Sequence, residues 1–436
     1  MRSAAVHSTA PNFATRRNRY MSMPAEHGEL PQHGGNHSPD ESQSCGVDIG
    51  DGSGGERRRK RRDILDGLLP DVLQIMEKPQ TAESDANVTI AGVQSLASYN
   101  WTTREVPTII VPGSPRIWSN PSFPLTVLGE SGEAFIDQNS HRLPDYPMLP
   151  IFEAVDTLTA DGSRTPPAWA SIDIITDRNN LLKLAGWADS SCSSSRSKKD
   201  FRIDFELVGP QTVLLQRWEE RPCVWAEGAF GDAFEKAAAH PAPGCEDSTL
   251  AGSSRVISYD YSGLRIMVRF DVDACMLPDA MSSTNVTSST LPSPRPPKFT
   301  NGPAVIHAGH EVPQVSLIKI KTRAQGKTGG FPGSAEYLQL LLGQTPTLYV
   351  GIHQNGTFKS VKERALESPE FAYSAQKVQP GLKKLRRLLE DIRTVAVQRG
   401  KEARLSLVCR KGVLQVMIRS GGESLLPGDI LQRFVV

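Results

Sequence analysis

The feature that most constrains the fold is a strict alternation of apolar and charged residues between positions 201 and 207. The apolar residues occupy every second place, at Phe201, Ile203, Phe205 and Leu207. A period of two is the side-chain period of a β-strand with one buried face. The segment 211–220 follows after a short turn and predicts the hairpin partner of this strand. The centre of the chain is therefore expected to be a β-sheet.

Other segments add both strands and helices to this sheet. A hairpin is predicted from 255–261 and 264–274, turning at Ser262 and Gly263. Further strands are predicted in 314–323 and 347–353, and helices in 178–188, 231–239, 335–343 and 382–396. This mixture predicts an α/β (α+β) fold with a central mixed β-sheet flanked by helices.

Composition bounds the size of the folded core. The 436 residues include 36 Gly and 32 Pro, and only 38% are hydrophobic. We therefore expect one domain, spanning residues 93–436, rather than the two or three that the length allows. Loop insertions are predicted at 188–199, 238–254 and 277–302.

Residues 1–92 are predicted to be a disordered basic tail with one short helix at 63–77, which Pro70 would bend. Six successive cations, Arg57 to Arg62, suit an importin, and a solvated linker is the alternative. We expect a nuclear or cytoplasmic protein. Mitochondrial localisation, suggested by the arginines near the N-terminus, is the less favoured alternative. No apolar run approaches the roughly 20 residues of a membrane span, so no membrane partner is expected.

Net charge excludes a global attraction to nucleic acid. The formal charge is +1, so any surface for RNA must be local. One local candidate is the helix at 382–396, whose cations include Lys383, Lys384 and Arg387; a solvated helix face is the alternative. Neither a phosphate-binding loop nor a dinucleotide-binding glycine motif follows a predicted strand.

The residues that carry chemistry form an ordered series. A helix contains Glu235, a strand ends in Asp271 and Asp273, and a further strand carries Lys319 and Lys321. Residues i and i+2 of a strand share one face, so each of these two strand pairs is expected to point one way. Clustered carboxylates hold the divalent cations that phosphodiester hydrolysis needs, and a nearby lysine stabilises the developing charge.

This series resembles the PD-(D/E)XK nuclease superfamily and, within it, the DXO-type decapping exonucleases, of which the chain looks like a divergent, fungal-like member. Five stretches between about residues 125 and 360 carry the resemblance in the family's order. They are IDIITDRNNLLKL, GDAFE, DVDA, KIKT and YLQLLLGQTPTLYVGI.

The resemblance implies a role for each matching residue. Glu235 and Asp273 would be metal ligands, with Asp271 acting directly or through water, and the ion would be Mg²⁺ or Mn²⁺. Lys321 would be the catalytic lysine. Arg178 would bind the RNA 5′ end, and Gln339 would hold nucleophile and substrate.

Lys319 departs from the family, which has a glutamate ligand at this position. A second lysine beside Lys321 opposes metal binding through a lost ligand and through repulsion, on the order of 4 kcal/mol for unit charges 4 Å apart at an effective dielectric constant of 20. Glu311 or Glu336 could replace the missing ligand, although neither lies at the family's position.

Two functions remain open. The first is metal-dependent phosphodiester or pyrophosphate hydrolysis at RNA 5′ ends, as in decapping and 5′–3′ exonucleases. The second is a catalytically degenerate nuclease fold that binds RNA or a protein partner. Without the joint order of the residues, Asp271 and Asp273 could simply end a strand, and Arg178 could form a surface ion pair.

Overall fold

The strand predicted from the 201–207 alternation lies in the middle of a large sheet. It is β8 (Phe201–Val208), between β9 (Thr212–Arg217) and β19 (Leu405–Arg410). One part of the prediction is wrong, because β8 is buried along its whole length and not on one face. Its charged residues tolerate this because they are paired: Arg202 Nε donates to Asp204 Oδ1 at 2.6 Å, and Glu206 accepts from Arg419.

The computed structural model describes residues 61–435 except 161, 194–199, 277–291 and 327–332. All of these residues belong to one compact unit, Arg58–Val436. The second unit, Met1–Arg57, lies outside the described residues, as does most of the predicted importin-binding run. No helix among the described residues is long and apolar enough to cross a membrane.

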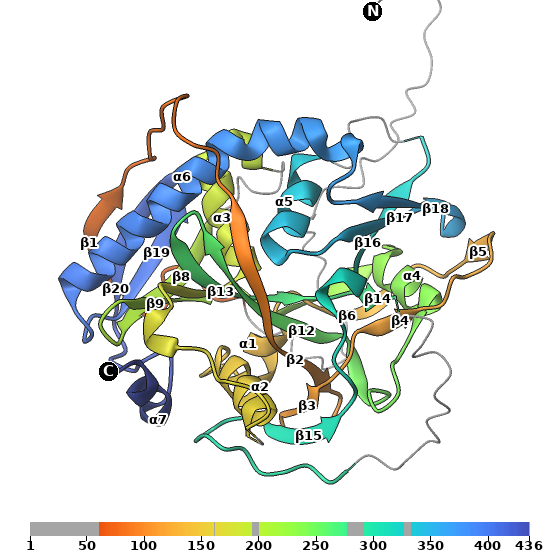
Figure 1. Cartoon of the computed structure of the whole chain (residues 1–436), viewed down its shortest axis with the longest axis horizontal. Coiled ribbons are helices and arrows are strands. Elements are labelled where there is room, and N and C mark those ends of the chain that lie inside the picture. The colour runs from red at the N-terminus through yellow and green to blue at the C-terminus, as the bar shows by residue number, and fades with distance from the viewer. Residues whose placement is uncertain (1–60, 161, 194–199, 277–291, 327–332, 436) are drawn as a thin grey trace, which may run out of the picture. The chain divides into compact units, whose positions relative to one another are not determined.

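Eleven strands form the larger sheet of the described residues (Figure 1). In spatial order they are β1 (Leu68–Met76), β20 (Val413–Arg419), β19, β8, β9, β7 (Ile174–Asp177), β13 (Leu264–Asp271), β12 (Ser248–Tyr261), β2 (Ile90–Thr102), β3 (Thr108–Pro112) and β15 (Ala304–Ala308). The strand pairs β13–β7 and β7–β9 are parallel, whereas β12–β13 and β8–β9 are antiparallel. The predicted mixed sheet is confirmed.

A smaller sheet of seven strands stands beside the first. Its order is β11 (Ala239–His240), β4 (Arg116–Trp118), β14 (Ala274–Cys275), β16 (Leu317–Ala324), β17 (Thr347–Gln354), β18 (Thr357–Ala365) and β5 (Leu125–Thr126). The strands β6 (Ser131–Phe135) and β10 (Cys223–Glu227) pair separately.

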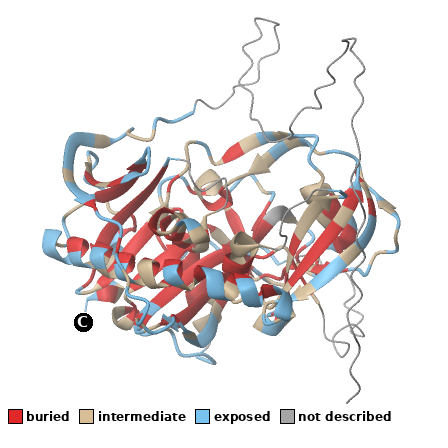
Figure 2. Cartoon of the chain, turned by 90° about the horizontal axis from the view of Figure 1, so that it is seen from above, coloured by how far each residue is buried: buried red, intermediate tan, exposed pale blue. Residues whose placement is uncertain are grey.

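Helices cover both faces of the larger sheet, so its central strands are buried, whereas the edge strand β1 is mostly exposed (Figure 2). Neighbouring residues of β13 show the two faces, since Met267 packs with one hydrophobic cluster and Val268 with another. The first face carries α2 (Leu149–Thr159), the 3₁₀ turn η1 (Trp169–Ser171) and α7 (Gly428–Leu431); the second carries α3 (Arg178–Ala188), α5 (Ser334–Gly343) and α6 (Pro369–Arg399). The short α1 (Gln138–Arg142) follows β6. The fold class predicted from the sequence is therefore correct.

The helix predicted at 63–77 is wrong. Residues 68–76 form β1, the edge strand that pairs antiparallel with β20. Pro70 has no main-chain N–H to donate, which an edge strand tolerates because only one of its sides is paired. The register with β20 also shifts between Leu68 and Val72, around this proline. Order therefore begins well before residue 93, and residues 61–92 are not the disordered tail that was predicted.

The loop predicted at 238–254 is also largely wrong, because β11 and the first part of β12 fall within it. In 188–199, the described part contains the 3₁₀ turn Ser190–Cys192, and residues 194–199 lie outside the described residues. In 277–302, residues 277–291 likewise lie outside them, and Arg295 forms an isolated bridge with Val305.

The cationic side of α6 binds the protein itself. Lys384 pairs with Asp189 at 2.6 Å, and Arg387 pairs with Asp85 at 2.8 Å. Lys383 donates to the main-chain oxygen of Asp85. These cations fasten the loop between β1 and β2, and the segment after α3, to the helix. Arg387 remains 45% exposed, but all three cations are engaged by groups of the chain itself.

One crossing of the chain positions the site. β13 ends at Asp271 in the larger sheet, and β14 begins at Ala274 in the smaller one. The chain thus passes between the sheets over two residues, Val272 and Asp273. Side chains at the end of β13 are thereby brought next to those of β16, which pairs with β14.

Candidate functional site

The sequence-predicted acids and lysines meet at this crossing. Residues that line one cavity of about 460 Å³ include Glu235, Asp271, Asp273, Lys319 and Lys321. They come from α4 (Gly231–Ala238), from the end of β13, from the crossing itself and from β16. The expected convergence of Glu235, Asp273 and Lys321 in one cleft is therefore present, although up to 86 positions separate them in the chain (321 − 235).

Strand alternation orients the two lysines. Ile318 and Ile320 are buried in the hydrophobic cluster of the smaller sheet, so Lys319 and Lys321 point to the opposite side, where the cavity lies. On α4, Phe234 is buried and stacks on Phe358 with 4.0 Å between ring centroids. Packing of Phe234 holds the helix against the sheet and carries Glu235 to the cavity edge.

Gly351 on β17 is required for this packing. A Cβ atom at Gly351 would lie 2.9 Å from ring atoms of both Phe234 and Phe358. Only glycine leaves the space in which the two rings stack, so this position supports α4 indirectly.

Asp273 is held at both oxygens. Lys319 Nζ lies 2.6 Å from Oδ1, and the main-chain N–H of Ile320 donates to Oδ2 at 2.7 Å. The side chains are 16% and 9% exposed, respectively, for Lys319 and Asp273. Lys319, at the position where the resemblance implies a glutamate, thus forms an ion pair with a residue predicted to be a metal ligand.

The surroundings shift the pKa values of Glu235, Lys321 and Asp271. Burial raises the pKa of the Glu235 carboxyl well above its ordinary value, Asp273 adds to this, and Lys319 opposes it. The neighbouring Lys319 ammonium, followed by burial, lowers the pKa of Lys321 to about 8. Burial raises the pKa of Asp271, against the effect of Arg217 and Arg178. Glu235 is therefore biased toward its neutral acid.

Arg178 and Gln339 lie on the side of the larger sheet. Arg178 begins α3 directly after β7, and its guanidinium lies over the Phe270 ring, 4.9 Å from the centroid. Its Nη1 donates to the main-chain oxygen of Gln339 at 3.3 Å. Burial lowers the pKa of Arg178, and the nearby Asp271 and Asp273 oppose this shift by favouring the charged form. Gln339 is joined to the group through its backbone.

An enclosed ion pair fixes the start of α3. Arg269 on β13 and Asp177 on β7 are paired in the parallel ladder, and Arg269 donates through Nε and Nη2 to the two Asp177 oxygens at 2.7 and 3.0 Å. Its Nη1 donates to the Pro147 oxygen at 2.6 Å. Because Asp177 directly precedes Arg178, this pair also determines where Arg178 emerges.

The residues do not fit the divalent ion that the resemblance implies. Both oxygens of Asp273 are engaged, and Lys319 and Lys321 add two positive charges beside them. In the part of the chain that the structure describes, no three His, Cys, Asp or Glu residues are grouped so that they could hold a metal ion. A hard cation needs several oxygen ligands at 2.0–2.6 Å, and this site does not supply them.

The two acids considered as replacement ligands have other partners. Glu311 pairs with Arg164, and Glu336 accepts from the Gly333 N–H at 2.9 Å, capping α5. The suggestion that either one completes a metal site is not supported by these contacts.

Sequence reasoning missed three residues near the cavity. Asp232 lines it, and its N–H donates to Glu130 at 2.7 Å. Asp232 belongs to the GDAFE stretch and could have been considered. Glu130 and Arg217 could not, because they lie outside the motifs: Glu130 precedes β6 and accepts from Asp232, and Arg217 ends β9 and acts electrostatically on Asp271.

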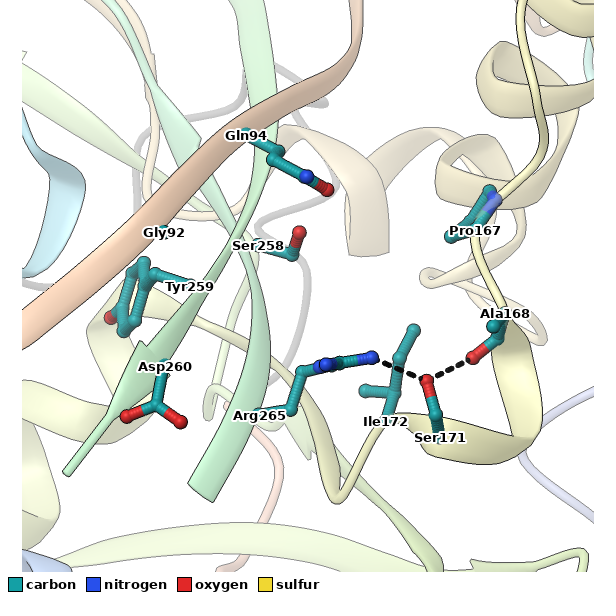
Figure 3. Close-up of a pocket in the computed structure, with 10 residues that line it drawn as sticks. All are labelled: Gly92, Gln94, Pro167, Ala168, Ser171, Ile172, Ser258, Tyr259, Asp260 and Arg265. Atoms are coloured by element: carbon teal, nitrogen blue, oxygen red, sulfur yellow. Dashed lines mark hydrogen bonds between the residues drawn. The ribbon is translucent and has the colours of Figure 1, made fainter. Parts of the chain in front are cut away.

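A second hollow lies at the opposite end of β13 (Figure 3). It measures about 280 Å³, and Gln94, Ser258 and Arg265 are among its lining residues. The Arg265 guanidinium is already engaged, since Nη1 donates to Ser171 Oγ at 2.7 Å. Arg265 and Asp260 are exposed surface residues. This hollow is smaller and gathers fewer buried charges than the cavity at Asp273, which is therefore the stronger functional candidate.

Solved structures resemble this fold at low sequence identity. Rai1 of Scheffersomyces stipitis, in complex with (3'-NADP)+ and calcium ion, has a TM-score of 0.53 and 11% identity, with 83% of this chain and 95% of that chain covered. A mutant S. pombe Rai1 in complex with 3'-FADP reaches 0.49 at 12% identity, covering 77% and 95%. Candida albicans Rai1 with pU5-Mn2+ reaches 0.46 at 12%, covering 80% and 95%.

The likeness to the S. stipitis protein establishes the type of fold and confirms that part of the predicted resemblance. No curated protein matches the sequence. A family model matches residues 70–420, which span both sheets and every residue discussed at the cavity. The chain belongs to the family described as Domain of unknown function (DUF8563).

Proposed function

We propose that this protein binds RNA 5′ ends in the cavity at Asp273 and does not hydrolyse them with a divalent metal. The observation that carries the proposal is the Lys319–Asp273 pair, with Nζ and Oδ1 2.6 Å apart, in a fold similar to S. stipitis Rai1. That protein is described in complex with (3'-NADP)+ and calcium ion. Here the ion pair leaves the cavity without a metal-ligand set but with cations.

The remaining charges suit a terminal phosphate. Lys319 neutralises Asp273, and burial biases Glu235 toward its neutral form, so the Lys321 ammonium is available to an anion. Arg178 does not line the cavity but interacts electrostatically with Asp271 and Asp273. A terminal phosphate carries about −1.5 to −2 charge at pH 7, compared with −1 for an internal phosphodiester. A small cavity with one available ammonium would therefore prefer an RNA end to the middle of a strand.

The test compares two short RNAs of one sequence, with a 5′-phosphate or a 5′-hydroxyl, by fluorescence anisotropy in EDTA. The phosphorylated RNA is expected to bind more tightly. Lys321→Ala should weaken that binding roughly tenfold to a hundredfold, because a charge-assisted hydrogen bond contributes about 1.5–3 kcal/mol. Lys362→Ala, at an exposed position of β18, is the matched control and should change little. Equal binding of both RNAs would reject the proposal.

Metal-dependent hydrolysis at RNA 5′ ends (decapping and 5′–3′ exonuclease action with Mg²⁺ or Mn²⁺) is the second candidate. It is favoured by one observation, the meeting of Glu235, Asp271, Asp273 and Lys321 around one cavity. The experiment is incubation of capped and triphosphorylated RNA with each ion. Release of nucleotide or pyrophosphate by the wild type, abolished in Asp273→Asn, would replace the binding proposal with this one.

We further propose nuclear import through Arg57–Arg62, with a cytoplasmic pool as the alternative. Two cations of the run also contact the domain: Arg61 pairs with Glu220 at 2.6 Å, and Arg62 donates to the Glu219 oxygen at 2.6 Å. An importin would have to use the preceding four cations or displace these contacts. Microscopy of a fluorescent fusion, with residues 57–60 changed to alanine, tests this; unchanged nuclear signal would exclude the segment.

A further inference from the structure

The cavity at Asp273 collects acids that would repel one another without a cation among them. Asp232, Glu235, Asp271 and Asp273 all line it. The cation nearest to Asp273 belongs to the chain itself. We infer that the Lys319 ammonium takes the place of a divalent cation, and that residue 319 decides whether this cavity can bind one. The inference concerns metal binding and does not depend on RNA being the ligand.

Backbone geometry fixes the ammonium in this place. Residue 319 lies on β16, a strand held between β14 and β17, with Ile318 opposite Ala274 and Lys319 opposite Leu348. The buried neighbours Ile318 and Ile320 prevent the strand from turning its other face to the cavity. Lys319 therefore cannot leave the acids by a local rotation of the backbone; only its side chain could move.

Lys319 and Ile320 each bind one oxygen of the Asp273 carboxylate. Lys319 contacts one oxygen at 2.6 Å, and the N–H of Ile320 contacts the other at 2.7 Å. Metal–oxygen distances are 2.0–2.6 Å. An ion bound to the Oδ1 atom would thus overlap with the ammonium, which occupies the space that the ion would need.

Lys319 is the side chain that contacts the Asp273 carboxylate directly. Glu235 and Asp271 line the cavity beside Asp273, and the main-chain contact from Ile320 would orient Asp273 whatever side chain residue 319 carried. Lys319→Glu would remove the competing cation and add a carboxylate at the same position. The substitution would thereby supply an oxygen ligand that the described acids lack as they stand.

The experiment is titration of the purified full chain with Mn²⁺, followed by electron paramagnetic resonance of the free ion. The wild type is expected to show no saturable site up to about millimolar Mn²⁺. Lys319→Glu should bind tighter by roughly two orders of magnitude, because a repulsive charge is lost and a ligand is gained. Lys362→Glu, the same change at an exposed place, should behave as the wild type.

Two further variants keep the inference open to refutation. Lys319→Glu combined with Asp273→Asn should lose the gained affinity, which would locate the ion in the cavity. If Lys319→Glu does not fold, Lys319→Gln takes its place and should bind Mn²⁺ more tightly than the wild type. Tight Mn²⁺ binding by the wild type that Asp273→Asn removes would overturn the inference. So would a folded Lys319 variant without any gain. RNA binding in EDTA is measured separately, so its failure would leave this result intact.

Discussion

Two ion pairs of this protein have similarly buried carboxylates but differently enclosed cations. Arg269 is 2% exposed and opposes Asp177, at 10%, whereas Lys319 is 16% exposed and opposes Asp273, at 9%. The arginine pair is bidentate and has a further hydrogen bond to Pro147. The lysine pair has one side-chain contact and opens on a cavity of about 460 Å³.

The comparison distinguishes an ion pair that stabilises the fold, Arg269–Asp177, from one that forms part of a site, Lys319–Asp273. A planar guanidinium satisfies both carboxylate oxygens at once, so the Arg269–Asp177 pair is complete without solvent. An ammonium is a point charge with further donors, and Lys319 presents these to the cavity. We therefore expect changes at the first pair to affect folding and changes at the second to affect binding.

The largest expected effect is on stability. Arg269→Met should lower the free energy of unfolding by about 3–5 kcal/mol, because it leaves Asp177 buried without its partner. Lys319→Met should cost only roughly 1–2 kcal/mol, since Ile320 still binds Asp273 and water reaches it through the cavity. Urea unfolding of both variants measures this. Equal losses would mean that both pairs are structural.

The second-largest expected effect is a change in the affinity for 5′-phosphorylated RNA with pH. Lys321 has a pKa of about 8 because of Lys319 and burial, so it is charged below that pH and neutral above it. Affinity for 5′-phosphorylated RNA should fall about tenfold between about pH 7 and pH 9.5 as this ammonium is lost. Lys321→Ala should flatten the profile. A wild-type profile without a step would assign the phosphate to another cation.

A smaller effect is expected on the pH dependence of stability. The pKa of Glu235 is raised in the folded state, chiefly by burial. Protonation therefore favours the folded state: this contribution is complete below the unfolded pKa and is lost as pH rises through the folded pKa. Glu235→Gln should remove the loss, so its unfolding midpoint should exceed that of the wild type at pH 8 more than at pH 4. The same difference at both values would contradict the assignment.

The smallest effect should come from a surface pair. Arg387 and Asp85 lie 2.8 Å apart with side chains 45% and 31% exposed. Asp85→Asn should change the free energy of unfolding by less than about 1 kcal/mol, and less again in high salt. Thermal melts at two salt concentrations are sufficient. A loss as large as that of Arg269→Met would show that the loop carried by α6 is essential to the core.

Prediction from the sequence succeeded where a pattern is local. Residues 231–239 were predicted as a helix, and 255–261 with 264–274 as a hairpin; α4, β12 and β13 confirm this. It failed at 63–77, where apolar spacing suited a helix but pairing with β20 prevailed. Strand pairing between residues more than 300 positions apart leaves no trace in a local period, which explains that error.

The chemical groups of the site could be identified from the sequence alone: Glu235, Asp273 and Lys321 in order, and a lysine at 319 on the same strand face as Lys321. The partners of these groups depend on the tertiary structure. Lys319 reaches Asp273, 46 positions away, because the chain crosses between two sheets there. Arg387 of α6 likewise pairs with Asp85, 302 positions earlier in the chain. Periodicity records which face of an element is buried, whereas charge pairing depends on where packing brings distant elements together.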